Sequence, residues 1–487
     1  MSSTPGDAAD PPGWIREAVA YEIFVDRFAN GDPSLDPANV DPFGSPPTKT
    51  GFMGGDLRGI TDRLGYLEEL GVNLVLLTPI FMSSSNHRYN TYDYYRIDPR
   101  LGTIEDFRRL VGEAHHRGIR VLLDGVFNHC GRGFFPFFDV MENGAASEWS
   151  EWFYINGFPV DAYGAHRFRA WQDAPALPEY NLANRRAREY LLRVAEFWTR
   201  EGIDGWRLDA VLHVRHREFW SELREVVRRA NPAAYLLAEI WEDPKPWLDA
   251  GYFDGATNYR LRELVLEFVL EESIDASDFA GRLEDLVTRQ PWPIALGMCN
   301  LVASHDTPRI RTLARGNRAR VKLALFLQFF FPGIPAIYYG DEIGLEGGQD
   351  PDNRRAMEWD PASWDQDLRR FVRELAACRR ALRPLQSGTW QTVVADDGKR
   401  LCVFMRRSGA EVALLVIGNG EREESVSLDC RALDLSEAGS FADRLSGRVL
   451  LAEDGVLRID RLPPHSGALL VSTVAQMRAE RAPITAL

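Results

Sequence analysis

Short runs of apolar residues recur through the first two thirds of the chain, and a segment with helical spacing of its apolar positions follows most of them. Runs of this length are typical of strands that are buried on both faces of a parallel sheet. We expect such strands at residues 18–25, 74–77, 121–126, 205–208, 235–238, 301–304 and 336–339, with a weaker candidate at 253–258. The alternation of strand and helix predicts an α/β fold.

The segments between these runs keep their apolar residues on one helical face. Leu64, Leu67 and Leu70 recur at steps of three before Gly71, and residues 190–198 show a similar pattern. Eight strands that alternate with helices are the count of a (β/α)₈ TIM barrel, which carries its active site at the carboxyl ends of its strands. A doubly wound parallel sheet has the same alternation and is the alternative.

Two segments interrupt this order. Residues 128–184 are rich in Gly, Phe, Trp and Pro and are too long for an ordinary loop, so they predict an inserted domain that walls the active site. After about residue 388, short apolar runs alternate with glycines and acidic turns, which predicts an all-β sandwich. The expected domains are the catalytic barrel at 1–127 and 185–387, the inserted domain at 128–184, the C-terminal β-sandwich at 388–475 and a polar tail at 476–487.

Composition narrows the classes of partner and the location. The 71 acidic and 57 basic residues give a formal net charge of -14, which disfavours nucleic acid and anionic membranes as partners. The 13 Trp, 15 Tyr and 26 Phe include flat faces suited to sugar rings, although most of them are expected in the core. The five cysteines form no C-x-x-C pair, and the N-terminus shows no secretory signal, so we expect a cytoplasmic protein.

Polar residues stand at the ends of several expected strands. Asp124 and His129 follow the third strand, Asp209 the fourth, Glu239 the fifth and Asp306 the seventh. In a barrel these strand ends meet on one rim, so we expect the side chains to converge. A single carboxylate at a strand end is more often a helix cap or half of an ion pair, and only the set of residues indicates catalysis.

Two of these carboxyl groups suit the hydrolysis of a glycosidic bond. That reaction needs a protonated carboxyl for the leaving oxygen and an ionised carboxylate at the anomeric carbon. Adjacent parallel strands lie about 4.8 Å apart, close to the roughly 5 Å between the carboxyl groups of retaining enzymes, so Asp209 and Glu239 fit these roles. Arg207 stands two positions before Asp209 and points to the same side of the strand, where its charge favours an ionised nucleophile.

Four segments together resemble the signatures of the α-amylase superfamily, also called glycoside hydrolase family 13. They read Asp-Gly-Val-Phe-Asn-His at 124–129, Gly-Trp-Arg-Leu-Asp at 205–209, Ala-Glu-Ile-Trp at 238–241 and Ser-His-Asp at 304–306. The resemblance spans about residues 19–359, and it implies a nucleophile, an acid/base and a transition-state stabiliser at Asp209, Glu239 and Asp306. It also implies that Arg207, His129 and His305 hold the sugar at the minus-one subsite.

Further segments extend the resemblance to substrate binding. Residues 86–94 contain His87 and Tyr89, and residues 348–354 contain Asp350 and Arg354. The resemblance implies that Tyr89 stacks on a sugar ring and that His87, Asp350 and Arg354 contact hydroxyl groups. Trp241, in the Glu-Ile-Trp sequence, is a further expected substrate-binding residue.

Within the superfamily, the chain looks most similar to the neopullulanase, cyclomaltodextrinase and maltogenic amylase group. It departs from that group at residues 177–181, which read Leu-Pro-Glu-Tyr-Asn where the group usually has Met-Pro-Lys-Leu-Asn. Leu212 and His213 replace the usual Asn-Glu of the group. We also expect the chain to lack the N-terminal β-domain with which these enzymes generally dimerise, so the resemblance leaves the oligomeric state open.

An oxygen-rich segment is similar to a calcium loop of the same group. The expected ligands are Asn30, Asp32, Asp36, Gly54 and Asp56, and hard oxygen donors of this kind suit Ca²⁺. Leu35 stands where the group usually has an asparagine ligand. An Asx-rich turn without a metal is the alternative, and we expect no organic cofactor.

The expected activity is hydrolysis of α-1,4-glucosidic bonds in maltooligosaccharides, cyclodextrins or related α-glucans, with retention and through a covalent glycosyl-enzyme intermediate. A transferase or isomerase similar to trehalose synthase, or an exo-acting α-glucosidase of the same family, is the enzymatic alternative. A barrel resembling the non-catalytic heavy chains of amino-acid transporters is the alternative from another class. Against it, all three carboxylates are present and the sequence shows no membrane anchor.

Overall fold

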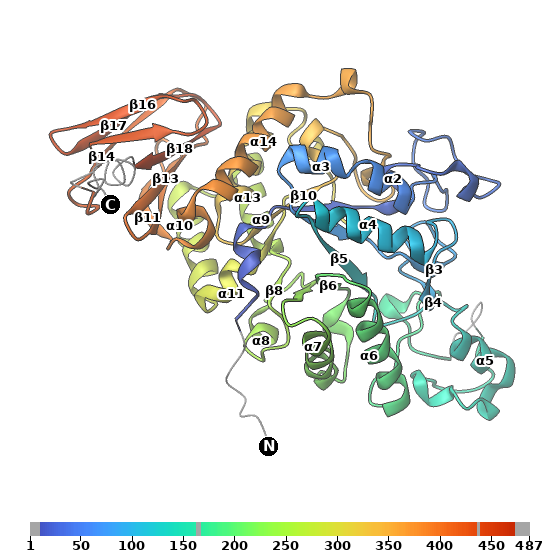
Figure 1. Ribbon diagram of the computed structural model, residues 1–487. Helices are drawn as coiled ribbons and strands as arrows, with labels where there is room; N and C mark the ends of the chain where they lie inside the picture. Colours follow the sequence, from blue (N-terminus) through green and yellow to red (C-terminus); the bar gives the residue numbers. More distant parts are fainter. Residues whose placement is uncertain (1–9, 162–166, 436–438, 473–487) are drawn as a thin grey trace, which may run out of the picture.

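The computed structural model describes residues 10–161, 167–435 and 439–472, which form a helix-covered barrel and a neighbouring β-domain (Figure 1). Eight short strands pair in parallel in the order β8-β7-β6-β5-β2-β1-β10-β9. Their bounds are β1 (Ala20–Ile23), β2 (Leu74–Leu77), β5 (Arg120–Gly125), β6 (Gly205–Leu208), β7 (Tyr235–Ala238), β8 (Gly255–Ala256), β9 (Cys299–Asn300) and β10 (Ile334–Tyr338).

The two ends of this sheet meet. A parallel bridge joins Thr257, just after β8, to Cys299 in β9, and the amide of Asn258 donates to the Cys299 carbonyl at 2.8 Å. The eight strands therefore form a nearly closed barrel rather than an open doubly wound sheet. This result confirms the predicted fold class.

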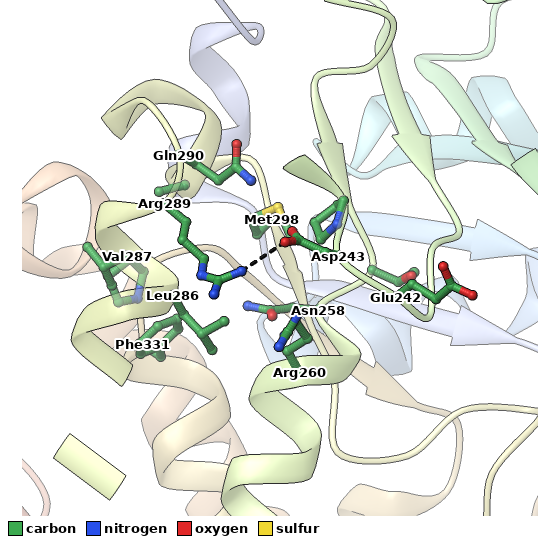
Figure 2. A pocket seen from close by; sticks show the side chains of 14 residues that line it. Glu242, Asp243, Asn258, Arg260, Leu286, Val287, Arg289, Gln290, Met298 and Phe331 are labelled. Carbon is green, nitrogen blue, oxygen red and sulfur yellow. Dashed lines mark hydrogen bonds and ion pairs between the residues drawn. The ribbon is translucent and has the colours of Figure 1, made fainter. Parts of the chain in front are cut away.

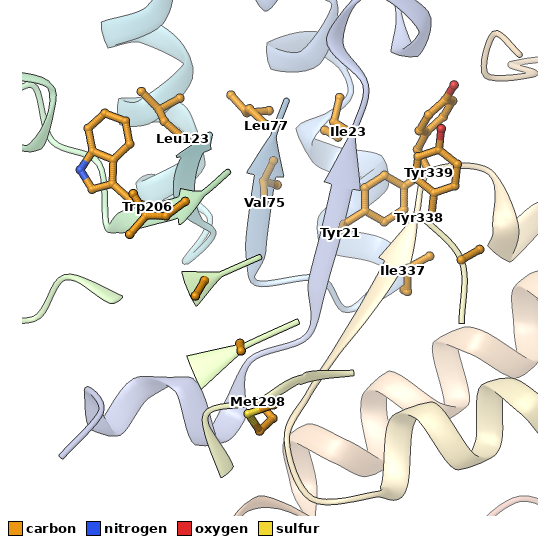
Figure 3. Packing of buried hydrophobic residues seen from close by; sticks show 14 of the residues in the cluster. Tyr21, Ile23, Val75, Leu77, Leu123, Trp206, Met298, Ile337, Tyr338 and Tyr339 are labelled. Atoms are coloured by element: carbon orange, nitrogen blue, oxygen red, sulfur yellow. The ribbon is translucent and has the colours of Figure 1, made fainter. Parts of the chain in front are cut away.

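Successive residues of each strand face opposite sides of the barrel wall. Ala20 and Leu76 belong to a cluster of small and branched side chains that fills the lumen. Ile23, Val75 and Leu77 point the other way, toward the helices, as Figure 3 shows for several strands. Because both faces are buried, the strands read as continuous apolar runs in the sequence.

Helices surround the barrel, and several begin at side-chain caps. Thr103 and Asp106 form a capping box at α4, and the side chains of Asn184 and Asn317 accept amide hydrogen bonds at the starts of α6 and α13. The helices of this layer are α1 (Val25–Phe28), α2 (Leu57–Asp62), α3 (Leu64–Leu70), α4 (Ile104–His116), α6 (Arg185–Arg200), α7 (Glu218–Ala230), α8 (Lys245–Leu248), α9 (Tyr259–Val265), α10 (Ala276–Thr288), α11 (Trp292–Leu296), α12 (Ile310–Leu313), α13 (Arg318–Phe330), α14 (Gln366–Ala381) and α15 (Arg383–Ser387).

The described part of the long segment between β5 and α6 contains the α-helix α5 (Phe135–Asn143), short 3-10 turns and isolated bridges such as Phe153 to Tyr180. Phe137 packs its ring 5.0 Å from that of Phe153 and 4.9 Å from that of Phe168, so the segment has an aromatic core of its own. A hairpin of β3 (Phe81–Ser83) and β4 (Thr91–Ile97) also projects from the barrel. The turn of this hairpin carries His87 and Tyr89.

The C-terminal part is an antiparallel sheet of eight strands, in the order β11-β12-β13-β18-β15-β16-β17-β14. Strands β12, β13 and β18 share one buried cluster with β14 and β17, so the sheet folds over a core of its own. The guanidinium of Arg406 donates to the Phe330 carbonyl at 3.0 Å and ties this part to the barrel. The strands are β11 (Gln391–Asp396), β12 (Leu401–Ser408), β13 (Glu411–Gly418), β14 (Glu424–Asp429), β15 (Ser440–Asp443), β16 (Val449–Glu453), β17 (Val456–Leu462) and β18 (Ser466–Ser472).

The predicted strands agree with the structure except at the seventh. The expected run 301–304 follows the strand, because the ladder partners are Cys299 with Ile334 and Asn300 with Pro335. Residues 301–304 instead lead from the barrel wall into the site. The domain boundaries remain predictions, and the expected tail 476–487 lies outside the described residues. In the described part of the chain, every helix is too short or too polar to span a bilayer.

Candidate active site

The residues predicted from the strand ends converge at one end of the barrel. Asp209 directly follows β6 and Glu239 directly follows β7, while Asp306 lies six residues beyond β9. They line a cleft of about 530 Å³. Its lining is Lys49, His87, Tyr89, His129, Trp171, Gln172, Leu177, Asp209, Ala210, Leu212, His213, Glu239, Trp241, His305, Asp306, Asp350 and Arg354. All expected catalytic and substrate-binding residues are in this set except Arg207, which lies beneath it.

Arg207 connects the carboxylates at the bottom of the cleft. Its Nη1 lies 2.8 Å from Asp124 Oδ2 and 3.0 Å from Asp209 Oδ1, and its Nη2 lies 2.8 Å from Glu239 Oε1. The side chain is 9% exposed, so these ion pairs are shielded from water. One guanidinium fixes three carboxylates, which gives the two expected catalytic groups a common reference point.

A sharp turn of the backbone after Asp209 directs an amide toward Glu239. Ala210, the residue after Asp209, has φ 51° and ψ 37°, a left-handed conformation that costs a non-glycine residue about 1–2 kcal/mol. In this conformation the amide of Ala210 donates to Glu239 Oε2 at 3.1 Å. The indole of Trp241 donates to Glu239 Oε1 at 3.2 Å, so both oxygens of Glu239 are held.

Charge and burial act differently on the carboxyl groups around Arg207. Burial, and after it the charge of Glu239, raises the pKa of Asp209 well above its ordinary value, although Arg207 opposes the shift. Burial also raises the pKa of Asp124 to about 6, again against Arg207. The crowded carboxyl groups around Arg207 therefore do not all ionise together, and attack by Asp209 requires that the retained proton lie on a neighbouring carboxyl group.

His305 and Asp306 form a second polar cluster beside the first. His305 Nε2 lies 2.7 Å from the hydroxyl of Tyr89 and 3.1 Å from Asp306 Oδ2. Arg354 reaches Asp306 Oδ1 at 3.1 Å and Asp350 Oδ1 at 3.2 Å. Burial acts to raise the pKa of Asp306, but the charges of His305 and Arg354 outweigh it and lower the pKa. Asp306 is therefore an ionised carboxylate over the cleft.

Aromatic side chains line the walls of the cleft. The ring of Trp241 stacks on that of Tyr259 with 3.7 Å between centroids, and 46% of Trp241 is exposed. Trp171, from the segment 128–184, lies 5.5 Å from the ring of His129 and 6.1 Å from that of His213. Trp171, Gln172 and Leu177 of this segment line the cleft, and Trp171 offers an apolar face to a sugar ring.

Sequence reasoning missed four residues near the carboxylates. Lys49, Trp171 and Gln172 line the cleft, and no motif or strand end distinguishes them in the sequence. Glu22 contacts His305 Nδ1 from β1. A signal for Glu22 did exist, because it is the one charged residue within a strand that is otherwise buried and uncharged.

The expected calcium ligands divide into two sets. Asn30 and Asp36 lie together, since Asn30 Nδ2 is 3.0 Å from both carboxylate oxygens of Asp36, and Asn30 Oδ1 is buried without a partner among the described residues. A Cβ on Gly54 would collide with this pair. In contrast, Asp32 and Asp56 accept hydrogen bonds from backbone amides at the starts of short helices. Asn30, Asp36 and Gly54 fit a cation site, whereas the carboxylates of Asp32 and Asp56 cap helices.

A separate hollow is lined by Glu242 and Asp243, which follow β7, and by side chains of α10 and its C-terminal end (Figure 2). Arg289 bridges the two segments, with its Nη1 2.8 Å from Asp243 Oδ2. None of the three expected catalytic carboxylates lines it. We interpret this ion pair as a contact that stabilises the loop between β7 and α8, which also contains Trp241.

Comparisons with known proteins agree with this geometry. The family model for the alpha amylase catalytic domain matches residues 22–383. A cyclomaltodextrinase of Geobacillus thermopakistaniensis is 41% identical over 467 residues, which cover 95% of this chain and 78% of that protein. An intracellular maltogenic amylase of Bacillus subtilis is 39% identical over 440 residues, which cover 90% of this chain and 74% of that protein.

A solved structure is similar over almost the whole chain. It is a cyclic α-maltosyl-(1→6)-maltose hydrolase from Arthrobacter globiformis in complex with that cyclic sugar. The two structures superpose with a TM-score of 0.87 at 39% sequence identity, over 95% of this chain and 100% of that one. Barrel, wall segment and C-terminal sheet are therefore all present in a relative that binds a cyclic α-glucan.

Proposed function

The chain belongs to the α-amylase family and is a glycoside hydrolase, and from this premise we propose that it cleaves α-1,4-glucosidic bonds of maltooligosaccharides and cyclodextrins with retention of configuration. One observation carries the proposal. The guanidinium of Arg207 contacts both Asp209 and Glu239 at the bottom of a cleft with aromatic walls. Two carboxyl groups held this closely suit a covalent intermediate, since the inverting route needs space for a water between them.

In the proposed first step, the carboxylate of Asp209 attacks the anomeric carbon. A bond forms between an Asp209 oxygen and that carbon, and the bond to the leaving sugar breaks as Glu239 gives its proton to the departing oxygen. In the second step a water adds to the anomeric carbon, returns a proton to Glu239 and releases Asp209. The product keeps the α configuration because each step inverts it once.

Asp306 supports this reaction through its charge. We assign it the stabilisation of the positive charge that develops on the sugar ring, because its ionised form is held between His305 and Arg354 at the edge of the cleft. Tyr89, with its ring stacked on His305 at 5.4 Å, offers a flat face for the sugar in the minus-one subsite. His87, His129, Asp350 and Arg354 are positioned to contact hydroxyl groups of the minus subsites.

A product profile tests the proposed substrates. The enzyme is incubated separately with maltotriose, β-cyclodextrin, pullulan, starch and trehalose, and the products are followed by chromatography and proton NMR. We expect maltose and glucose from the cyclodextrin and oligosaccharides, released first as the α anomer. Isomerised or elongated products without net release of reducing sugar would contradict hydrolysis and favour a transferase.

Hydrolysis of a cyclic maltosyl-maltose is a second candidate activity. The relative from Arthrobacter globiformis that is named for this substrate shares the chain's three structural parts at a TM-score of 0.87. Adding the cyclic tetrasaccharide to the same product profile separates the candidates. A kcat/KM for the tetrasaccharide that exceeds the value for β-cyclodextrin would select it as the preferred substrate.

We further propose a structural Ca²⁺ ion at Asn30 and Asp36, beside the backbone of Gly54. The buried, unpartnered oxygen of Asn30 and the adjacent carboxylate support this assignment. The ion would crosslink the loop before α2 and take no part in the chemistry. Thermal unfolding tests it: we expect Ca²⁺ to raise Tm over EDTA in the wild type but not in Asp36→Ala, while an Asp62→Ala control responds like the wild type. Equal Tm values with Ca²⁺ and EDTA in the wild type would refute the site.

A cytoplasmic location is also proposed. A relative is named an intracellular maltogenic amylase, and the five cysteines are all unpaired and buried, as expected in a reducing compartment. Fractionation of the source cells, with activity measured in the medium and the lysate, tests the location. Activity confined to the medium would contradict it.

A further inference from the structure

Glu22 carries a carboxylate into the interior of the barrel. It lies on β1 two residues after Ala20, on the lumen face, in register with Leu76 on β2 and Tyr338 on β10. It borders a small cavity of about 40 Å³ between the apolar filling of the lumen and the residues that hold the catalytic groups. Among the described residues, the ionisable acidic and basic side chains that line this cavity are those of Glu22, Asp124, Arg207 and His305. The Glu22 side chain is 19% exposed, and a carboxylate that is largely withdrawn from water gains from a cationic partner.

That partner is His305. The carboxylate of Glu22 contacts Nδ1 of the ring, and the ring is 4% exposed. On the opposite side of the ring, Nε2 faces the hydroxyl of Tyr89 at 2.7 Å and the carboxylate of Asp306 at 3.1 Å. Both nitrogens of His305 thus face oxygen atoms.

The hydrogen-bond directions determine the protonation state of the ring. The hydroxyl of Tyr89 donates its single proton to Asp124 Oδ2 at 2.8 Å, so toward His305 its oxygen acts as an acceptor. Nε2 must therefore carry a proton. Nδ1 faces the carboxylate of Glu22, which accepts a proton as well. Only the doubly protonated imidazolium satisfies both contacts.

We propose that Glu22 is a positioning residue, which holds His305 as an imidazolium and thereby keeps Asp306 ionised and oriented over the cleft. The inference deepens the proposed hydrolase function and rests on it for its catalytic consequence. Glu22 itself does not line the substrate cleft. Four side chains form a row of alternating negative and positive charge. Glu22 pairs with His305, His305 with Asp306, and Asp306 with Arg354.

The groups around His305 support the same charge state. Burial lowers the pKa of the imidazole, but the charges of Asp306 and Glu22 outweigh it and raise the pKa, against Arg207. Asp124 also faces the ring from β5 through Tyr89, while Arg354 and the neutral His87 approach from the loops above. Asp306 and Glu22 are thus the two carboxylates that favour the imidazolium, and removal of the Glu22 charge leaves Asp306 as the single carboxylate in contact with the ring.

Replacement of Glu22 by glutamine tests the proposal without removing volume. The amide NH2 of glutamine can donate to Nδ1, which a carboxylate cannot do. A neutral ring with its proton on Nε2 then keeps its contacts with the Tyr89 oxygen and the Asp306 carboxylate. We therefore expect His305 to lose its charge at a lower pH in Glu22→Gln than in the wild type.

The first measurement is a titration of the substrate-free enzyme by NMR with ¹³C-labelled histidine. The chain has nine histidines, and His305→Gln identifies the signal. We expect the pKa of His305 to fall by about one unit or more in Glu22→Gln, a factor of about ten in its protonation equilibrium. Glu22→Asp keeps the negative charge, so the pKa of His305 should stay above its ordinary value, as in the wild type. An unchanged His305 titration in Glu22→Gln would overturn the proposal.

A matched control removes another buried carboxylate next to β1. Glu342 accepts from the hydroxyls of Tyr21 at 2.8 Å and Tyr66 at 2.6 Å, on the helix side of the barrel wall, and does not line the cleft. Glu342→Gln should leave the titration of His305 at its wild-type position. A shift of equal size in Glu342→Gln would assign the effect to general loosening and contradict the role of Glu22.

The second measurement is the pH dependence of kcat/KM on maltotriose. We expect kcat/KM of Glu22→Gln to fall further below the wild-type value as pH rises. The largest ratio between the two values should be about tenfold for each unit by which the pKa of His305 is lowered. The loss should appear in kcat more than in KM. A pH-independent loss would indicate a merely structural role. If the wild type hydrolyses no α-glucan, the proposed function fails, and the NMR titration still decides the charge state of His305.

Discussion

The floor and the walls of the cleft are built on different physical principles. The floor, defined as Arg207, Asp209, Glu239, His305 and Asp306, is a set of charged groups with fixed partners, and all of them except Asp306 are buried. The walls, defined as Trp171, Gln172, Leu177, Leu212, His213 and Trp241, offer mainly aromatic and apolar faces. Buried charges need exact partners, whereas apolar faces only need area, so we expect the floor to determine the chemistry and the walls to determine which glucan fits.

The floor and the walls also come from different parts of the fold. Each floor residue lies in a barrel strand or within six residues of the end of one. Trp171 and Gln172 come from the inserted segment, where Gln172 has φ 47°. The indole nitrogen of Trp171 is buried and has no partner in the described part of the chain. Because loops carry specificity more often than the elements that they connect, we expect substitutions in the wall to alter substrate selection more than the barrel.

The largest effect is expected from the floor. Asp209→Asn removes the nucleophile and should lower kcat by at least about 10⁴-fold on every substrate, because no neighbouring group can form the covalent bond. Steady-state kinetics on maltotriose and β-cyclodextrin measure it. Asp249→Asn, at the exposed C-terminal end of α8, is the control and should retain activity within a few-fold. Near-normal turnover by Asp209→Asn would remove the distinction between floor and walls.

An intermediate effect is expected from a substitution that removes a hydrogen bond to the floor but leaves every charged group in place. Tyr89→Phe removes the hydroxyl that joins Asp124 to His305 and should lower kcat roughly 10- to 100-fold, the scale of hydrogen bonds to charged groups. Tyr92→Phe is the matched control, since its hydroxyl bonds only the exposed Ser84 at 2.7 Å. An equal loss in both variants would show that the hydroxyl of Tyr89 has no special role.

A smaller effect, of a different kind, is expected from the wall. Trp171→Ala should change the ratio of kcat/KM for β-cyclodextrin to that for maltotriose by about five- to tenfold, since it removes an aromatic face from only part of the cleft. Trp149→Ala, in the same inserted segment but outside the cleft, serves as the control. If both substrates decline in parallel after Trp171→Ala, this wall residue affects the chemistry rather than the selection of substrates.

The smallest effect concerns stability at low pH. Burial lowers the pKa of His129 to about 3, below its ordinary value of about 6.5, so the folded state excludes a proton that the unfolded state binds. This contribution is present above about pH 6.5 and is lost as pH falls toward 3. In urea unfolding at about pH 7 and pH 4, His129→Gln should lose less stability than the wild type. A steeper loss in the variant would show that His129 is charged in the folded state.

Much of the fold and floor could be predicted because the signals are local. A strand buried on both faces must be apolar along its length, and a strand end that bears Asp209 or Glu239 stands out against it. The seventh strand was placed two residues late, because the apolar run 301–304 continues past the ladder that ends at Asn300. Apolar sequence reports burial and not hydrogen bonding, so it does not define where a strand ends.

The sequence by itself determined the barrel, the carboxylates and the family resemblance, since each depends on residue type at fixed spacing along one segment. The tertiary structure alone decided that Glu22 meets His305 across 283 positions of chain, and that Trp171 faces the cleft. It also decided that the carboxylates of Asp32 and Asp56 cap helices, apart from the pair of Asn30 and Asp36. Such contacts depend on how closure of the barrel and folding of long loops bring distant segments together, and no local pattern records that.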